Sequence, residues 1–137
     1  MATVDDGPQD LPTGPLVTGG VVALATVLLA VRDPHVAGSY GGCPSFLLLG
    51  VWCPACGGLR ATHDLAQGDL AGAWSMNPLW VLAVPLVIAI WVRWLARARA
   101  GRSLRSPPAW VAWVFGGVVV AFGILRNVPA LAPWLAP

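Results

Sequence analysis

The chain contains no lysine and no glutamate, and only 10% of its 137 residues are charged. A water-soluble domain of this length is typically about one-quarter charged, so this composition excludes the ordinary soluble class. The formal net charge of +2 is too small for a nucleic-acid partner, which needs clustered cations on a surface facing water. Because 57% of the residues are apolar and the mean hydropathy is +0.72, the sequence predicts a small membrane protein in contact with the lipid bilayer.

Common catalytic motifs are also missing from the sequence. It shows no Ser-His-Asp set, no spaced acid/base pair, no Gly-rich phosphate loop and no dinucleotide-binding fingerprint. These absences favour a non-enzymatic role.

Three apolar runs, at 16–31, 78–96 and 108–125, predict transmembrane helices. A helix needs roughly 20 apolar residues to cross about 30 Å of hydrocarbon, so the second and third runs fit well and the first is short. The residues before the first run carry aspartates and no cation, unlike the leader of a signal peptide, so we expect this run to be a span. The sequence therefore predicts an all-α integral membrane fold, with three transmembrane helices in a single membrane domain at 16–127.

The distribution of arginine predicts the orientation in the membrane. Cations near a span are retained on the cytoplasmic side, where they can also contact anionic lipid head groups. We therefore expect a multi-pass plasma-membrane protein whose N-terminal tail, 1–15, and loop 97–107 are cytoplasmic. The segment 32–77, called the cap below, and the proline-containing interfacial tail 128–137 would then be extracytoplasmic. The clustered arginines are Arg93, Arg97, Arg99, Arg102 and Arg105.

The cap itself contains signals for local structure. Its apolar stretch 46–52 is too short to cross the bilayer and predicts a hairpin at the outer membrane interface. Two short helices are expected at 58–67 and 70–76, because Gly68 is a typical helix stop. Asn77 followed by Pro78 predicts the N-cap and first residue of the second span.

The cap also carries a recognisable motif. The run Cys53-Pro54-Ala55-Cys56-Gly57, followed by Arg60-Ala61, Gly68-Asp69 and Asn77-Pro78, resembles small bacterial membrane proteins of the domain of unknown function 2752 family. This chain departs from the family pattern at Ala55, where glycine is usual, and at Leu59, where threonine is usual. The resemblance implies no known activity. Candidate contacts to a ligand or partner in and beside the motif are Gly57, Arg60, Asp64, Gly68, Asp69, Asn77 and Pro78.

All three cysteines, Cys43, Cys53 and Cys56, lie in the cap, and three hypotheses follow. The favoured one is a structural disulfide from Cys43 to Cys53 or Cys56, because extracytoplasmic thiols tend to oxidise. Such a bond would pin a cap that docks a membrane-protein partner or a second copy of the chain. The second is thiol-disulfide exchange at Cys53 and Cys56, with the Cys56 pKa lowered by a helix N-terminus and Arg60.

The third hypothesis is a zinc or other soft-metal site. The Cys-x-x-Cys spacing is that of a zinc knuckle, and His35 in a Gly- and Pro-containing loop could supply the fourth ligand. His63 is a poorer fourth ligand, since it would lie about 10 Å from Cys56 along a helix axis. About 2 Å between two sulfur atoms would indicate a bond, and roughly 3.5 to 4 Å among all three would indicate a metal.

Arg60 on its apolar short helix needs a partner close to the bilayer. Asp64, four residues later, predicts a local ion pair. The alternative is a contact with an anion or other ligand in a small pocket between the hairpin and the second span.

Overall fold

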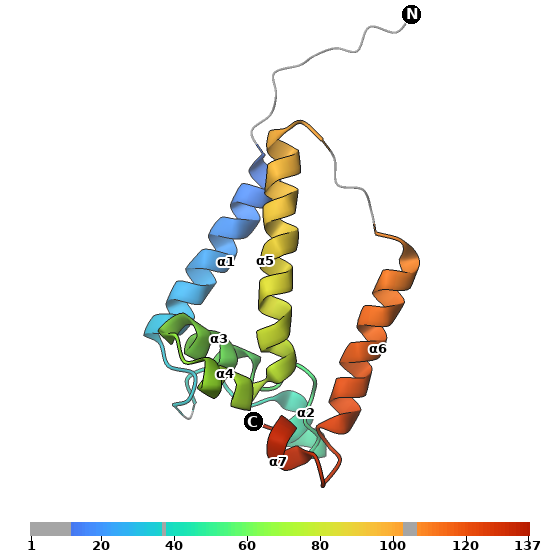
Figure 1. Cartoon of the computed structure of the whole chain (residues 1–137). Coiled ribbons are helices and arrows are strands. Elements are labelled where there is room, and N and C mark those ends of the chain that lie inside the picture. The colour runs from blue at the N-terminus through green and yellow to red at the C-terminus, as the bar shows by residue number, and fades with distance from the viewer. Residues whose placement is uncertain (1–11, 37, 103–106) are drawn as a thin grey trace, which may run out of the picture.

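The structure, a computed structural model, describes residues 12–36, 38–102 and 107–137. These residues form helices and loops without a strand, which confirms the all-α prediction. Three long helices, α1 (Thr13–Val31), α5 (Pro78–Arg99) and α6 (Ala109–Leu125), extend from one end of the molecule, where the short helices gather (Figure 1). The short helices are α2 (Pro44–Leu49), α3 (Gly58–Gln67), α4 (Leu70–Met76) and α7 (Ala132–Leu135).

Two of the long helices are long and apolar enough to cross a membrane. α1 has 19 residues and α5 has 22, whereas α6 is shorter, with 17. Most of the large apolar side chains on these helices are exposed in the described chain, as is expected of helices that face lipid rather than a protein core. These features indicate a membrane context, with α1 and α5 as candidate spans.

The beginning of α1 differs from the prediction. The sequence placed residues 13–15 in the N-terminal tail, but the helix begins at Thr13, with Pro12 as its N-cap. Pro15 is tolerated because it lies in the first turn, where a backbone N–H has no partner within the helix. The rest of the predicted tail, 1–11, and Arg105 of the arginine cluster lie outside the described residues.

α1 and α5 pack closely at Gly19. A Cβ atom added to Gly19 would lie 2.5 Å from the Trp91 ring, so only glycine fits there without a shift. The Trp91 indole N–H donates to the carbonyl of Pro15 at 2.9 Å. α6 stands apart from this pair in Figure 1, and its last turn contacts the cap, where Gly123 lies beside Pro54.

α3 and α4 begin and end where the sequence predicted. Gly68 ends α3 in the left-handed conformation, with φ of 82°, which glycine adopts without a Cβ penalty. The Asp69 carboxylate caps α4 by accepting the N–H of Gly72 at 2.8 Å. Asn77 caps α5, and Pro78 is its first residue, as predicted. α3 packs against α1, α4 and α5, and α4 also packs against α5.

The sequence predicted a hairpin and no helix at 46–52, but the first part of this stretch belongs to the short helix α2, with Gly50 as its C-cap at φ of 66°. Leu47, Leu48 and Leu49 on it are all largely exposed. The C-terminal residues fold back onto the cap, because α7 packs against α4 and Pro137 lines the pocket that holds the cysteines.

Candidate metal centre

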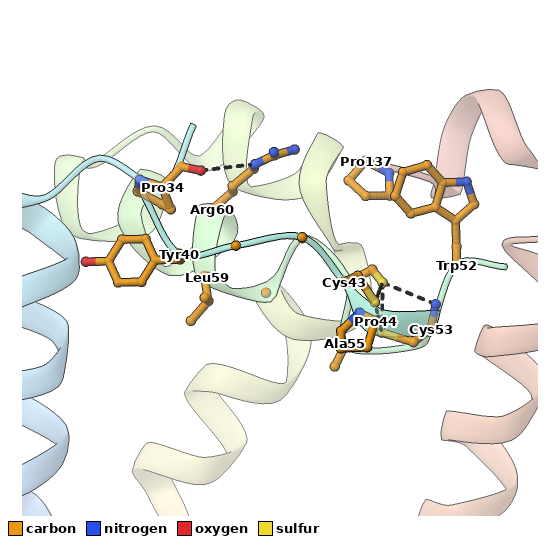
Figure 2. Close-up of a pocket in the computed structure, with 15 residues that line it drawn as sticks. Pro34, Tyr40, Cys43, Pro44, Trp52, Cys53, Ala55, Leu59, Arg60 and Pro137 are labelled. Atoms are coloured by element: carbon orange, nitrogen blue, oxygen red, sulfur yellow. Dashed lines mark hydrogen bonds between the residues drawn. The ribbon is translucent and has the colours of Figure 1, made fainter. Parts of the chain in front are cut away.

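The three cysteine sulfur atoms converge at the centre of the cap. Cys43 is the residue before α2, and Cys53 and Cys56 lie in the loop that leads into α3. The Sγ atoms of Cys43 and Cys56 are 2.8 Å apart, those of Cys53 and Cys56 are 2.8 Å apart, and those of Cys43 and Cys53 are 3.4 Å apart. The three side chains could therefore hold one metal ion together (Figure 2).

The predicted structural disulfide between Cys43 and Cys53 or Cys56 is wrong. A disulfide requires about 2.05 Å between its sulfur atoms, and all three cysteines are free. Cys56 approaches both other sulfurs equally, so the geometry selects no pair. The separations also fall below the roughly 3.5 to 4 Å expected around zinc, so ligation requires the sulfur atoms to move outward by about half an ångström to one ångström.

The local environment shifts the pKa values of Cys43 and Cys56 in opposite directions. Hydrogen bonds from the Cys56 thiol and with the Ser45 hydroxyl lower the pKa of Cys43 to about 6. Burial, followed by the hydrogen bonds with Cys43 and Cys53, raises the pKa of Cys56 to about 12. The sequence predicted the opposite for Cys56, because it counted the helix N-terminus and Arg60 and could not anticipate the burial of the sulfur among two others.

A buried arginine from the far end of the chain holds the cysteine loop. Arg126, directly after α6, is fully buried. Its Nη1 donates to the carbonyls of Cys53 at 3.0 Å, Cys56 at 2.8 Å and Pro54 at 3.4 Å. Its Nη2 donates to the carbonyl of Met76 at 3.3 Å. One guanidinium thus ties the end of α6 to the cysteine loop and to the end of α4.

The charge of Arg126 has no carboxylate partner among the described residues. Burial lowers its pKa, and ionised cysteines at Cys56, Cys53 and Cys43 would raise it. A buried cation is costly unless an anion lies close by, and the three cysteines are the nearby groups that can ionise. Sequence reasoning treated Arg126 only as the end of a span. The available signal was a lone arginine closing an apolar run.

Two asparagines complete the support of this loop. Asn77 is 1% exposed, and its Nδ2 donates to the carbonyls of Pro54 at 3.0 Å and Cys56 at 3.1 Å. Asn127 accepts the N–H of Trp52 and donates to its carbonyl, both at 2.9 Å. Side chains from other helices and loops therefore fix the backbone on both sides of the Cys-x-x-Cys turn. This preorganises the sulfur atoms.

Gly57 is required by the same packing. It has φ of 80°, a left-handed conformation that favours glycine. A Cβ atom there would clash with the carbonyl oxygen of Met76 and would lie 3.1 Å from Cβ of Pro137.

The cysteines line a cavity of about 360 Å³ between residues 40–44 and residues 52–60 of the cap. Figure 2 shows Arg60 and Pro34 toward one end of this cavity and the cysteines toward the other. Arg60 Nε donates to the carbonyl of Pro34 at 3.4 Å. The predicted ion pair of Arg60 with Asp64 does not occur in the described part of the chain, because Asp64 faces His35 instead.

The other predicted residues lie away from the sulfur atoms. His35, the expected fourth ligand, is grouped with Asp33 and His63 rather than with the cysteines. Gly68, Asp69 and Pro78 are helix boundaries and do not line the cysteine cavity.

Comparisons with curated proteins and with solved structures gave no match. The family comparison did give one, over the segment that holds all three cysteines, α2 to α4 and the first part of α5. Residues 43–91 match the model of the family described as "Protein of unknown function (DUF2752)", the family that the cysteine motif resembles.

Proposed function

We propose that this protein is a multi-pass membrane protein that binds a divalent transition-metal ion of the zinc class through Cys43, Cys53 and Cys56. The observation that carries this proposal is the convergence of three sulfur atoms on a loop whose carbonyls are held by the fully buried Arg126. Thiolates are the preferred ligands of such ions, and a metal lowers the thiol pKa so that all three can ionise.

The charges balance when a divalent metal is bound. Three thiolates and a divalent ion carry a net charge of −1, and the Arg126 guanidinium cancels it. Three neutral thiols would leave the buried cation uncompensated, and three thiolates without a metal would leave a net charge of −2. A lone thiolate at Cys43, whose pKa is about 6, would also balance Arg126, so the charge count supports the metal-bound state without requiring it.

Three protein ligands leave one coordination position of a tetrahedral ion open, as in sites that bind a further ligand. The cavity that the cysteines line gives that position access to other molecules, and Arg60 on the same cavity would favour an anionic one.

This proposal changes the order of the hypotheses drawn from the sequence. A docking module depended on a disulfide to pin the cap, and the sulfur distances do not support one. Thiol exchange depended on a lowered pKa at Cys56, which burial raises.

For the membrane arrangement, we propose α6 as a third span, with the cap and the C-terminus outside and the arginine-rich connection inside. Support comes from the layout in Figure 1, where the cap and the C-terminus lie at one end of the long helices, and the end of α5 and the start of α6 lie at the other. Arg97 and Arg99 occupy the last turn of α5, at the end away from the cap. Arginine retained on the cytoplasmic side would then place the cysteines outside.

Cobalt substitution tests the metal site, because thiolate ligation of Co²⁺ produces sulfur-to-metal charge-transfer absorption. The full chain is purified in mild detergent under reducing conditions and titrated with Co²⁺. We expect charge-transfer absorption in the native chain, its loss in Cys56→Ser, and its retention in Ser45→Ala, which removes a hydroxyl beside Cys43 but no sulfur.

Absorption that is absent from the native chain, or unchanged in Cys56→Ser, would refute thiolate ligation. A mixed disulfide trapped on Cys53 in the Cys56→Ser variant, without bound metal, would favour thiol exchange instead.

A further inference from the structure

A second group of metal-binding side chains lies where the loop after α1 meets α3. Asp33 and His35 come from the loop, and His63 comes from α3. One ligand atom from each lies within 4.8 Å of the others. We propose that Asp33, His35 and His63 bind a second divalent transition-metal ion, with Asp64 as a supporting carboxylate. This inference is independent of the cysteine centre, since the two sites share no residue.

His63 is oriented as a metal ligand. Its Nδ1 lies 2.7 Å from the carbonyl oxygen of Leu29, which can only accept, so Nδ1 carries the proton. The lone pair of a neutral imidazole is then on Nε2, which lies 3.8 Å from Asp33 Oδ1. Metal-binding histidines commonly donate their other ring N–H to a carbonyl or carboxylate in this way.

In His35 the roles of the two ring nitrogens are reversed, so that Nδ1 would bind the ion and Nε2 would carry the proton. Its Nδ1 lies 2.9 Å from Asp33 Oδ1, and its Nε2 lies 3.5 Å from Asp64 Oδ1. With Nδ1 on the ion, the Nε2 proton is directed at Asp64, which fixes the ring through a carboxylate. Ligand atoms about 2.0 to 2.2 Å from one ion lie about 3.0 to 3.6 Å apart, and the observed 2.9 and 3.8 Å bracket this range.

Asp64 provides an independent sign that a cation belongs here. It is only 8% exposed, and its Oδ2 has no hydrogen-bond partner. In the described part of the chain, the ion-pair partner of Asp64 is His35 alone. A nearly buried carboxylate needs positive charge nearby. Neutral imidazoles leave Asp33 and Asp64 with a net charge of −2, which one divalent ion would cancel.

The end of α1 adds to this preference for a cation. Leu29 and Ala30, in its last turn, direct their carbonyls toward α3, where His63 and Gln67 lie against them. The C-terminus of a helix carries partial negative charge and stabilises a nearby cation.

The donor set predicts which ion binds. Imidazole suits zinc, iron and nickel, whereas carboxylate and carbonyl oxygens alone suit magnesium and calcium. The side chains of Asp33 and His35 are 46% and 37% exposed, so an ion can enter from the cap surface and keep water in its open positions. The second site should therefore exchange its metal readily and, having no thiolate, bind soft ions such as Cu(I) less well than the cysteines do.

The test isolates this site by removing the other. Cys43, Cys53 and Cys56 are all replaced by serine in the full chain, and Zn²⁺ binding in detergent is measured by competition with a chromophoric chelator. We expect one zinc per chain, with affinity lowered at least about tenfold by Asp33→Asn or His35→Ala. Asp69→Asn is the matched control, because it also removes a cap carboxylate but keeps an N-cap acceptor for Gly72, and it should leave the affinity unchanged.

Zinc affinity that is equal in all these variants, or no zinc bound by a folded triple-serine chain, would overturn the proposal. If circular dichroism shows that the triple-serine chain does not fold, the same substitutions are made in the native chain loaded with Co²⁺. Asp33→Asn and His35→Ala should then each remove one Co²⁺ per chain and leave the thiolate charge-transfer absorption unchanged. Loss of that absorption, or no loss of Co²⁺, would contradict a separate site.

Discussion

Replacing Arg126 with methionine should lower the free energy of unfolding by about 3 kcal/mol, because buried carbonyls lose their donor. The side chains have similar bulk, but the variant leaves the carbonyls of Cys53 and Met76 without the hydrogen bonds from Arg126. It also removes the buried cation that we assign to the thiolate centre. Metal affinity at the three cysteines should therefore fall at least about tenfold, which corresponds to about 1.4 kcal/mol. Thermal unfolding and Co²⁺ titration in detergent measure the two effects separately.

Arg126→Lys separates charge from hydrogen bonding. Lysine keeps the positive charge but lacks the planar fork that reaches four carbonyls, so metal affinity should recover more than stability does. Arg99→Met, at the exposed far end of α5, is the control for loss of one arginine and should change neither quantity. If Arg126→Met binds metal as tightly as the native chain, the buried cation does not serve the sulfur centre.

Gly57→Ala should lower the free energy of unfolding by about 3 kcal/mol, of which the left-handed conformation accounts for about 1 to 2 kcal/mol. The remainder arises because the new Cβ would clash with the Met76 carbonyl, a backbone group that α4 holds in place. A shift of the loop that relieves the clash would also displace Cys56, the residue next to Gly57. Metal binding should therefore weaken together with stability.

Gly50→Ala is the matched control for this substitution. Gly50 also has a left-handed conformation, with φ of 66°, but no atom lies within 4 Å of its added Cβ. Chemical unfolding of the two variants should show the greater loss in Gly57→Ala. Equal losses would mean that the contact with Met76 contributes nothing to the cap.

Local signals in the sequence were sufficient to predict α3 and α4, although not α2. Gly68 stops α3 and Asn77 with Pro78 starts α5, because each acts within one helical turn of its own position. The apolar runs likewise predicted α1, α5 and α6, with small differences at their ends. These features depend on residues adjacent in the chain, which a single sequence displays directly.

The site depended on contacts between distant segments, which the sequence does not display. Arg126 reaches a loop 70 residues earlier through backbone carbonyls, which leave no pattern of residue types. The disulfide was inferred from the expected compartment, which governs the tendency of thiols to oxidise but does not determine where three sulfur atoms lie. His35 was predicted as the fourth ligand of the cysteines, but it lies with Asp33 and His63, and that grouping becomes apparent only when α3 packs against α1.

X-ray absorption at the zinc edge tests the central claim most directly. The native chain is reduced and loaded with one equivalent of zinc, and the number and distance of the sulfur neighbours are measured. Three sulfur neighbours at about 2.3 Å are expected in the native chain, and fewer in Cys56→Ser. A first shell of nitrogen and oxygen alone in the native chain would contradict a metal centre built from the three cysteines.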